Sequence, residues 1–334
     1  MNNEFMKSPD EAIIYYFDIL KNRTLQAFEL DLQRGKNGRE LFQPIIDIYS
    51  KLLFNDFNSL KHHIFIYTLE KVLEYEKKNK IEIDKTDLYF LLALSFAING
   101  NITNSLIYFE LAKTFVNEKK FVNKITNEFK TLFNSIDSGY QTLKSVSDNS
   151  ISSSFLPLGK LIKKLTGNSI LHLLLCGIKT LQIIHWINEK GLSIEILKII
   201  DLDLIISLSV LNESVLKQHS WVTKNHIGGI IDVDLRDCPK HTALFRAIKS
   251  IESTYVANTI SKFNNDMPKL IYDIKNNKYN QDEYKARIIK GFQMVRNSVA
   301  HDLNPTYYFY QSKEAMIDTI GLLFACTSII ADLK

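Results

Sequence analysis

The sequence predicts an all-α protein. Apolar residues recur mostly at spacings of three and four, as they do along the buried face of a helix. Glycine and proline, which interrupt helices, are scarce at 12 and 6 in 334 residues. The alternation typical of strands is confined to one brief stretch, GGIIDVDL at residues 228–235. We therefore expect helices along the whole chain.

Composition indicates a folded chain with two domains. Hydrophobic residues make up 46% of the sequence, enough for a sizeable core, and charged residues make up 23%, which is ordinary for a folded surface. A length of 334 residues exceeds that of a typical single domain. The net charge of +4 permits contact with a polyanion but does not by itself predict it.

Several features indicate a soluble protein of the cytoplasm. The three cysteines, Cys176, Cys238 and Cys326, are odd in number and form no C-x-x-C pair, which argues against disulfides and a zinc site. The first residues carry acidic side chains before any apolar run and make a poor signal peptide. The apolar stretch at residues 170–186 contains a lysine and two histidines, so we expect no membrane span.

A break in composition divides the chain. Six serines interrupt the helical pattern in SVSDNSISSSFLP at residues 145–157. Serine competes for backbone hydrogen bonds and favours turns, so we expect a linker or long loop at residues 145–156. The predicted domains are residues 1–144 and 157–334.

The first domain contains a pair of helices at about residues 87–118. Large and small side chains alternate in the order of two closely packed antiparallel helices: Tyr89, Leu92, Ala93 and Phe96, then Ser105, Phe109 and Ala112. This stretch resembles a single tetratricopeptide unit, which implies a helical hairpin able to bind a protein partner. Residues 62–78 are helical in pattern without repeating it, so plain helix packing remains the alternative.

The second domain is predicted to be a helical bundle. The helical patterns cover residues 158–191, 192–219, 242–266, a shorter stretch after Pro268, residues 282–303, and residues 312–333. Pro305 disfavours helical geometry at the residue before it and marks the end of the penultimate helix. The last helix is apolar enough to be largely buried. Short connections between such helices are typical of a bundle.

The penultimate helix carries the candidate catalytic residues, Arg296, Asn297 and His301, in the stretch RNSVAH. This stretch resembles the motif of the HEPN family of ribonucleases, in which arginine, a polar residue and, after a short variable run, histidine follow one another. The resemblance implies a helical bundle that pairs with a second copy across a cleft and cleaves RNA. It also implies a role as a toxin or an antiviral-defence effector.

A second stretch has the same spacing, from Arg236 to His241, but a proline lies between them. Pro239 cannot continue a helix, and His241 lies just before the helical pattern TALFRAI. We therefore assign the site to the later stretch.

The residue types suit cleavage of RNA without a metal or another cofactor. RNA supplies its own nucleophile, the 2′-hydroxyl, and a histidine can accept that proton or donate one to the leaving 5′-oxygen. The guanidinium of Arg296 offers a planar fork to the phosphate, and Asn297 can donate beside it. The expected products carry a 2′,3′-cyclic phosphate and a 5′-hydroxyl. No spacing of His, Asp and Glu suggests a metal site.

Helix geometry adds a constraint. Residues five apart on a straight helix diverge by about 140°, so Arg296 and His301 cannot point the same way. A cleft that reaches both sides of the helix or a local distortion of the helix would resolve this, and so would a partner copy. We expect the partner copy, because a two-fold homodimer with a composite active site brings the complementary residues together. The structural alternative is a solvated arginine and a histidine that caps the C-terminus of the helix.

Other residues are candidates for contact with RNA, which is the expected ligand. Four cations and one aromatic residue fall in or near the bundle: Lys240, Arg246, Arg287, Lys290 and Tyr307. For Tyr307, packing in the core is an equal alternative. Residues 1–144 are expected to bind a regulatory protein. The rival function is a non-catalytic helical adaptor or RNA-binding protein that uses the bundle for dimerisation.

Overall fold

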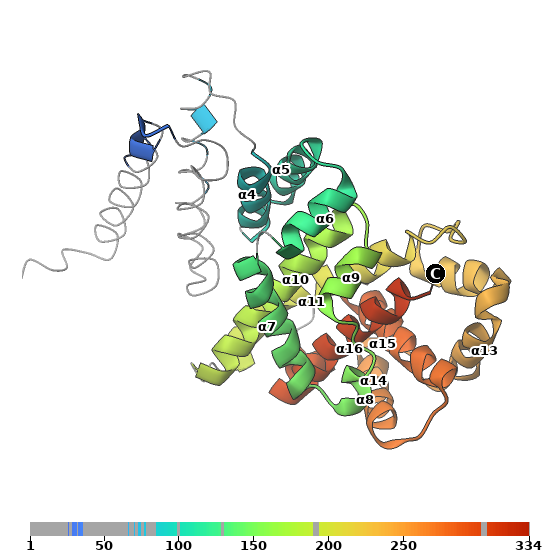
Figure 1. Cartoon of the computed structure of the whole chain (residues 1–334). Helices are drawn as coiled ribbons and strands as arrows, with labels where there is room; N and C mark the ends of the chain where they lie inside the picture. The colour runs from blue at the N-terminus through green and yellow to red at the C-terminus, as the bar shows by residue number, and fades with distance from the viewer. Residues whose placement is uncertain are drawn as a thin grey trace, which may run out of the picture. The chain divides into compact units, whose positions relative to one another are not determined.

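A computed structural model of the chain describes most residues from 85 onward. The described residues are 85–98, 101–127, 130–189, 194–301 and 306–333, with a few isolated positions before residue 85. The helical pattern at residues 62–78 lies largely outside them. Every regular element among the described residues is a helix, which confirms the all-α prediction (Figure 1).

The chain forms two compact units, residues 1–132 and 133–334. The boundary therefore lies upstream of the one predicted at residue 144. The difference arises because α7 (Lys130–Val146) runs through the expected end of the first domain and contributes most of its length to the second unit.

The described part of the first unit contains α4 (Thr86–Ile98), α5 (Ile102–Thr114) and α6 (Glu118–Asn127). The first two are the helices expected within residues 87–118. They approach closely because Ser105 and Ala93 are small and buried, and the Ser105 hydroxyl donates to the Ala93 carbonyl at 2.7 Å. Beside this contact the rings of Phe96 and Tyr108 stack with centroids 5.4 Å apart. The connecting residues 99–100 lie outside the described residues.

The serine-rich stretch at residues 145–156 is not a linker. It contains the end of α7 and a short helix, α8 (Asn149–Ser152), which Asp148 caps by accepting from the Ser150 N–H. Ile151 and Phe155 are buried in the second unit. Serine misled the prediction because its small side chain also permits close packing. A methyl group added to Gly321 of the last helix would meet the Ser147 hydroxyl at 2.5 Å.

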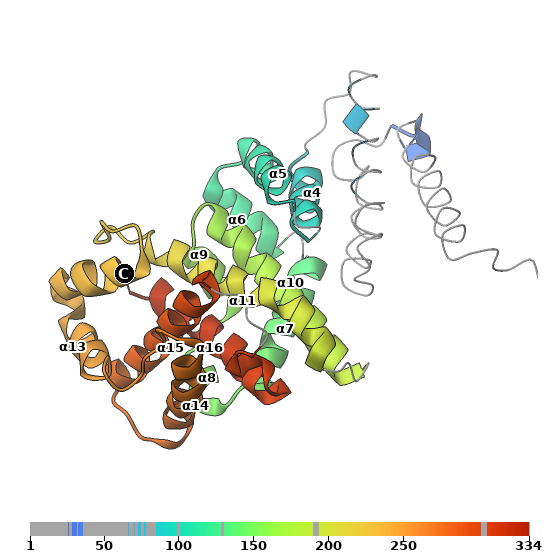
Figure 2. The ribbon, with the colours of Figure 1, turned by 180° about the vertical axis from the view of Figure 1, so that it is seen from behind.

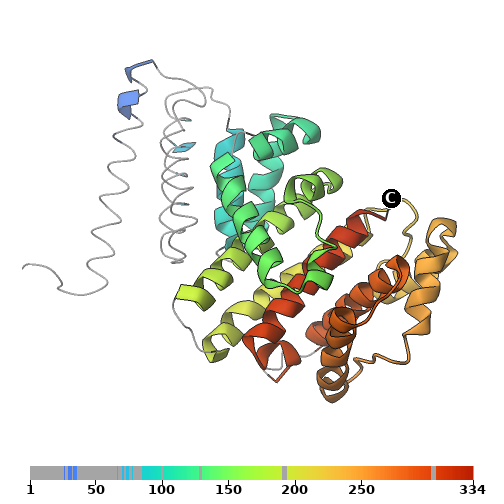
Figure 3. The same cartoon turned by 60° about the horizontal axis from the view of Figure 1, so that its bottom comes forward.

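The second unit is built around its last helix, α16 (Lys313–Ala331), which is buried along nearly its whole length. It packs against α11 (Ile194–Leu216) and α15 (Gln281–His301), and α10 (Asn168–Glu189) packs on α11 (Figures 1 and 2). Figure 3 shows α16 between the α7–α8 segment on one side and α14 and α15 on the other. The remaining helices of this unit are α9 (Leu158–Lys164), α12 (Ile227–Gly229), η1 (Ile230–Leu235), η2 (Pro239–His241), α13 (Thr242–Ser250), α14 (Ile260–Asn276) and η3 (Tyr308–Tyr310).

α16 has the length and hydropathy of a membrane span. It stands alone in this among the described helices, and 89% of its apolar window is buried inside the protein. The expectation of a largely buried last helix is therefore confirmed, and the apolar composition follows from its place in the core.

Four predicted elements differ from the structure. The pattern at residues 158–191 is two helices, α9 and α10, separated at residues 165–167. The helix expected at residues 242–266 is two helices, α13 and α14, separated by a connection at residues 251–259. Pro268 lies inside α14 instead of starting a new helix, because the buried side chains of Phe263, Met267 and Leu270 hold the helix to the core on both sides of it. The strand-like residues 228–235 form part of α12 and the π-helix η1.

Candidate functional site

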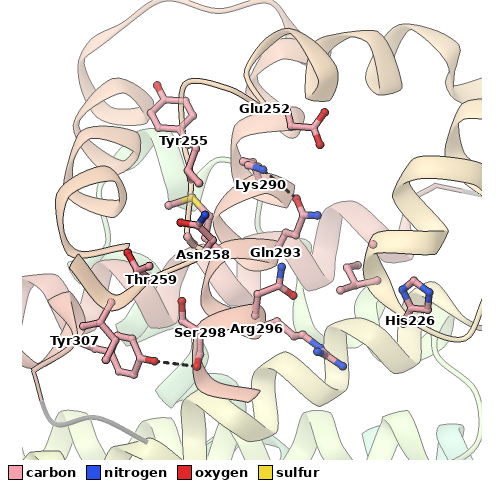
Figure 4. Close-up of a pocket in the computed structure, with 17 residues that line it drawn as sticks. His226, Glu252, Tyr255, Asn258, Thr259, Lys290, Gln293, Arg296, Ser298 and Tyr307 are labelled. Carbon is pink, nitrogen blue, oxygen red and sulfur yellow. Dashed lines mark hydrogen bonds between the residues drawn. The ribbon is translucent and has the colours of Figure 1, made fainter. Parts of the chain in front are cut away.

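A cavity of about 910 Å³ lies in the second unit, and two residues of the predicted motif line it. Its floor is the second half of α15. One wall is the connection at residues 251–259 together with the start of α14, and the other is the turn that leads into α12 (Figure 4). Three segments that are distant in sequence therefore form one site.

α15 presents the motif because its two faces differ in character. Phe292, Val295 and Val299 are buried against the core, while Arg296 and Asn297 are partly exposed and line the cavity. One turn earlier the helix lies tight against its neighbours: a methyl group added to Gly291 would come within 2.8 Å of Leu322 and 3.2 Å of Leu270. Close packing of α15 on α16 and α14 thus fixes the position of the motif.

The Arg296 guanidinium forms an ion pair with α11. Its Nε donates to the Glu213 carboxylate at 3.1 Å, and Lys217 donates to the same carboxylate at 2.8 Å. The side chain of Arg296 is 29% exposed. Figure 4 shows the guanidinium extending toward the side of the cavity where His226 lies. Because Nε faces Glu213, the terminal nitrogens remain the donors available to an anion.

Burial raises the pKa of the Glu213 carboxyl, but its hydrogen bond with Lys217 and the charge of Arg296 outweigh burial. The net effect is a pKa below the usual value. Glu213 is therefore a charged anchor for Arg296.

Asn297 is half-buried on the cavity surface, and its amide forms no hydrogen bond with a described residue. The next residue, Ser298, accepts a hydrogen bond at its carbonyl from the buried Tyr307 hydroxyl at 2.9 Å. This bond ties the last turn of α15 to the segment that follows it. Asn297 thus offers an amide to the cavity from a restrained backbone.

His301 is the last residue of α15, and its side chain lies outside the described residues. The helix nevertheless fixes its register. Residue 301 follows Asn297 by four positions, a spacing that places two residues on the same helix face. Arg296 is displaced from that face by about one residue's rotation of 100°.

Lys290 is a buried cation in the same cavity. It is 8% exposed, and its ammonium donates to the Gln293 side chain at 3.3 Å (Figure 4). Burial lowers the pKa of Lys290, and nearby Lys249 lowers it further, while Glu252 and Asp232 act in the opposite direction. An anion in the cavity would relieve this unfavourable burial of charge. Of the five residues predicted to contact RNA, Lys290 and Tyr307 lie at the cavity.

The Tyr307 prediction is corrected in favour of core packing. Its residue surface is 1% exposed, and its ring lies 5.3 Å from both Phe263 and Phe309, centroid to centroid. The ring therefore has no free face on which a base could stack. Its hydroxyl instead anchors α15 at Ser298.

The other three cations lie away from the cavity. Lys240 is exposed beside Trp221, and Arg246 is exposed beside the start of α15. Arg287 stacks on Tyr279 at 3.4 Å from the ring centre and donates to the Glu283 carbonyl, so it holds α15 against the connection that follows α14. The structure does not bring these three together with Arg296.

The rejection of the second motif agrees with the local geometry. Arg236 is exposed and pairs with its neighbour Asp237 at 2.8 Å. Pro239 begins the 3-10 turn η2, and His241 directly precedes α13. The ring of His241 is hydrogen-bonded to the Leu333 carbonyl at 3.1 Å, and neither residue lines the cavity.

Sequence reasoning missed two contributors to the site, Glu213 and His226. Glu213 stands on α11, and only the fold brings it to Arg296. His226 lines the cavity and had a local signal: a polar residue directly before the helical stretch is a candidate N-cap. The strand-like alternation of the residues that follow hid this helix start.

Among the described residues, no group of three or more His, Cys, Asp or Glu is placed to hold a metal ion, and the three cysteines, all of them described, are buried and form no disulfide. Comparison of the chain with protein-family models, curated proteins and solved structures finds no match.

Proposed function

We propose that the protein is a metal-independent endoribonuclease of the HEPN type that cleaves single-stranded RNA, and that it acts as a toxin or an antiviral-defence effector. The observation that carries the proposal is the cavity lined by Arg296 and Asn297 together with the buried ammonium of Lys290. Two cations and an amide at one hollow are suited to a phosphodiester, whose charge increases in the transition state.

The reaction needs only groups of the protein and of RNA. The 2′-hydroxyl oxygen attacks phosphorus and gives its proton to a base, the bond from phosphorus to the 5′-oxygen breaks, and that oxygen receives a proton. The strand before the break ends in a 2′,3′-cyclic phosphate, and the strand after it begins with a 5′-hydroxyl. His301 is assigned one of the two proton transfers.

The charged residues are assigned to the phosphate. The terminal nitrogens of Arg296 would bind its non-bridging oxygens, with Asn297 donating beside them. Lys290 would contribute charge from the floor of the cavity. A second copy of the chain is proposed to complete the site as a homodimer, and the first unit is proposed to bind a regulatory protein.

The test is cleavage of labelled single-stranded RNA in the presence of EDTA. We expect products with cyclic-phosphate ends, and we expect His301→Ala to lower the rate by about 10²–10⁴-fold, the usual contribution of a general acid or base. Arg296→Ala should lower it by about 10²–10³-fold through lost stabilisation of charge. Arg236→Ala, which changes the arginine of the second motif, is the matched control and should cleave like the wild type.

Two results would reject the proposal. Cleavage that persists undiminished in folded His301→Ala would remove the assigned chemistry. The wild-type protein is tested alone and with a protein from its own cell bound to the first unit. If it cleaves RNA in neither case, the result would favour the non-catalytic adaptor.

A further inference from the structure

The imidazole of His226 is held in one orientation on the cavity wall. Its Nδ1 accepts a hydrogen bond from the Gly229 N–H at 3.0 Å, which makes His226 the N-cap of α12. A ring nitrogen that accepts from an N–H carries a lone pair, so the proton of the neutral imidazole lies on Nε2. The side chain is exposed and lines the cavity. The ring therefore offers an Nε2–H donor to a ligand.

Glycine is required for this arrangement. A methyl group added to Gly229 would lie 2.9 Å from Cε1 and 3.0 Å from Nε2 of the His226 ring, closer than side-chain carbons approach in proteins. The ring can rest against the backbone only because residue 229 has no side chain. An alanine there would push the imidazole out of its present position.

The segment before His226 is fixed independently of the ring. Asp234, on the π-helix η1, accepts hydrogen bonds from the backbone N–H groups of Thr223 at 3.0 Å and Lys224 at 2.7 Å, and from the Thr223 hydroxyl. The carboxylate is buried, and the hydrogen bonds it accepts outweigh the effect of burial and keep its pKa below the usual value. π-helical turns occur frequently at functional sites, and here one anchors the turn that carries His226.

We propose that His226 is an RNA-binding residue of the candidate site, whose Nε2–H donates a hydrogen bond to a phosphate oxygen of the bound strand. The inference rests on the proposed ribonuclease function and adds a residue that the Arg-Asn-His motif does not contain. His226 reaches the cavity from the turn before α12, whereas Arg296 and Lys290 both reach it from α15, so together they can contact an anion from two sides (Figure 4).

The orientation of the ring defines its role. An imidazole whose Nδ1 is occupied by the Gly229 N–H and whose Nε2 carries the proton has no free lone pair to act as a base. His226 thus serves as a binding donor, whereas proton transfer is left to His301. A donor fixed before the ligand arrives strengthens binding because little entropy is lost when the contact forms.

The experiment uses the full chain and an uncleavable probe, a fluorescent single-stranded RNA with 2′-O-methyl groups, whose Kd is measured by anisotropy. His226→Asn is the informative variant because asparagine is a preferred N-cap residue and keeps the helix start while removing the imidazole. We expect its Kd to rise about ten-fold, the effect of losing one hydrogen bond to a charged group, with an unchanged Tm. Gly229→Ala, which keeps the imidazole but displaces it, should weaken binding similarly.

The control is His241→Asn, which removes an imidazole outside the cavity and should leave Kd unchanged. A wild-type Kd in folded His226→Asn would overturn the assignment, as would failure of the wild-type protein to bind the probe. Cleavage of ordinary RNA is measured separately. If the wild-type protein binds the probe without cleaving RNA, the catalytic proposal fails. The ratio of the Kd values of His226→Asn and the wild type still tests whether His226 contacts the RNA.

Discussion

Glu213 both orients the guanidinium of Arg296 and offsets part of its positive charge. Glu213 binds the guanidinium through Nε and thereby aligns the terminal nitrogens, but its carboxylate opposes the attraction of phosphate. Lys217 shares the same carboxylate and offsets part of that effect. If Arg296 is purely structural, the ion pair affects only the stability of the protein. If Arg296 binds phosphate, the ion pair also affects the affinity for RNA. The two cases predict different consequences of removing the negative charge.

The variant Glu213→Gln should have opposite effects on RNA affinity and on stability. Glutamine can still accept from Arg296, but the lost negative charge should tighten RNA binding by about five-fold, the equivalent of about 1 kcal/mol for one ion pair. Because the pKa of Glu213 is lowered in the folded protein, its stabilising effect is full above the usual value of 4.5 and disappears as pH falls through the folded value. The variant should therefore have a lower Tm at pH 7, by about 2–4 °C, and the difference should shrink in acid.

Lys217→Gln provides the comparison for that variant. It removes the other partner of the carboxylate and should lower the Tm without tightening RNA binding. Weaker RNA binding by Glu213→Gln would show that the charge of Glu213 is needed to orient Arg296, contrary to this account.

At the scale of elements, the serine-rich stretch shows how one residue type can indicate opposite structures. Serine side chains at residues 145–154 bond to nearby carbonyls, as they do in loops, yet α8 lies against α16 and α14. The Ser147 hydroxyl is buried without a partner among the described residues, directly over Gly321. Small size, rather than polarity, is the property used at this contact.

Gly321→Ala tests this contact. The added methyl group would meet the Ser147 hydroxyl at 2.5 Å and should destabilise the second unit by about 1–3 kcal/mol, the usual effect of overpacking. Ser147→Ala alone removes a buried hydroxyl without a partner and should be neutral or stabilising. In the double variant the remaining approach to the Ser147 carbon is 3.3 Å, so part of the lost Tm should return. Strictly additive effects would mean that residues 145–152 do not pack on α16 in solution.

Helices were predictable where buried apolar residues repeat along one face. They were less predictable where a tertiary contact overrides the local preference of the sequence. The spacing of apolar residues indicated α15 and α16 to within about two residues, because both have continuous buried faces. It failed at Pro268, since local propensity argued for a break that the core contacts of α14 override. It also failed at residues 228–235, where a π-helix presents apolar residues at a spacing that resembles a strand.

At the scale of the whole molecule, the candidate site was predictable only in the part that lies on one helix. Arg296 and Asn297 could be named from their order along α15, and both line the cavity. Glu213 and His226 precede them by 70 to 84 residues, and no local pattern connects positions so far apart. Lys290 lies on α15 itself, but its burial depends on the connection at residues 251–259, whose shape the sequence did not indicate.

The proposed homodimer makes a prediction that a self-contained site does not. Arg296 and His301 diverge by about 140° on their shared helix, so a composite site would join the arginine of one chain with the histidine of its partner. Arg296→Ala and His301→Ala, each inactive alone, should then regain activity when unfolded and refolded together. Half of the dimers formed at random are mixed, and each holds one intact site of two, so about a quarter of wild-type activity should return. The presence of mixed dimers in the preparation is verified by mass. If such a mixture is as inactive as either variant, both residues of each site lie on one chain.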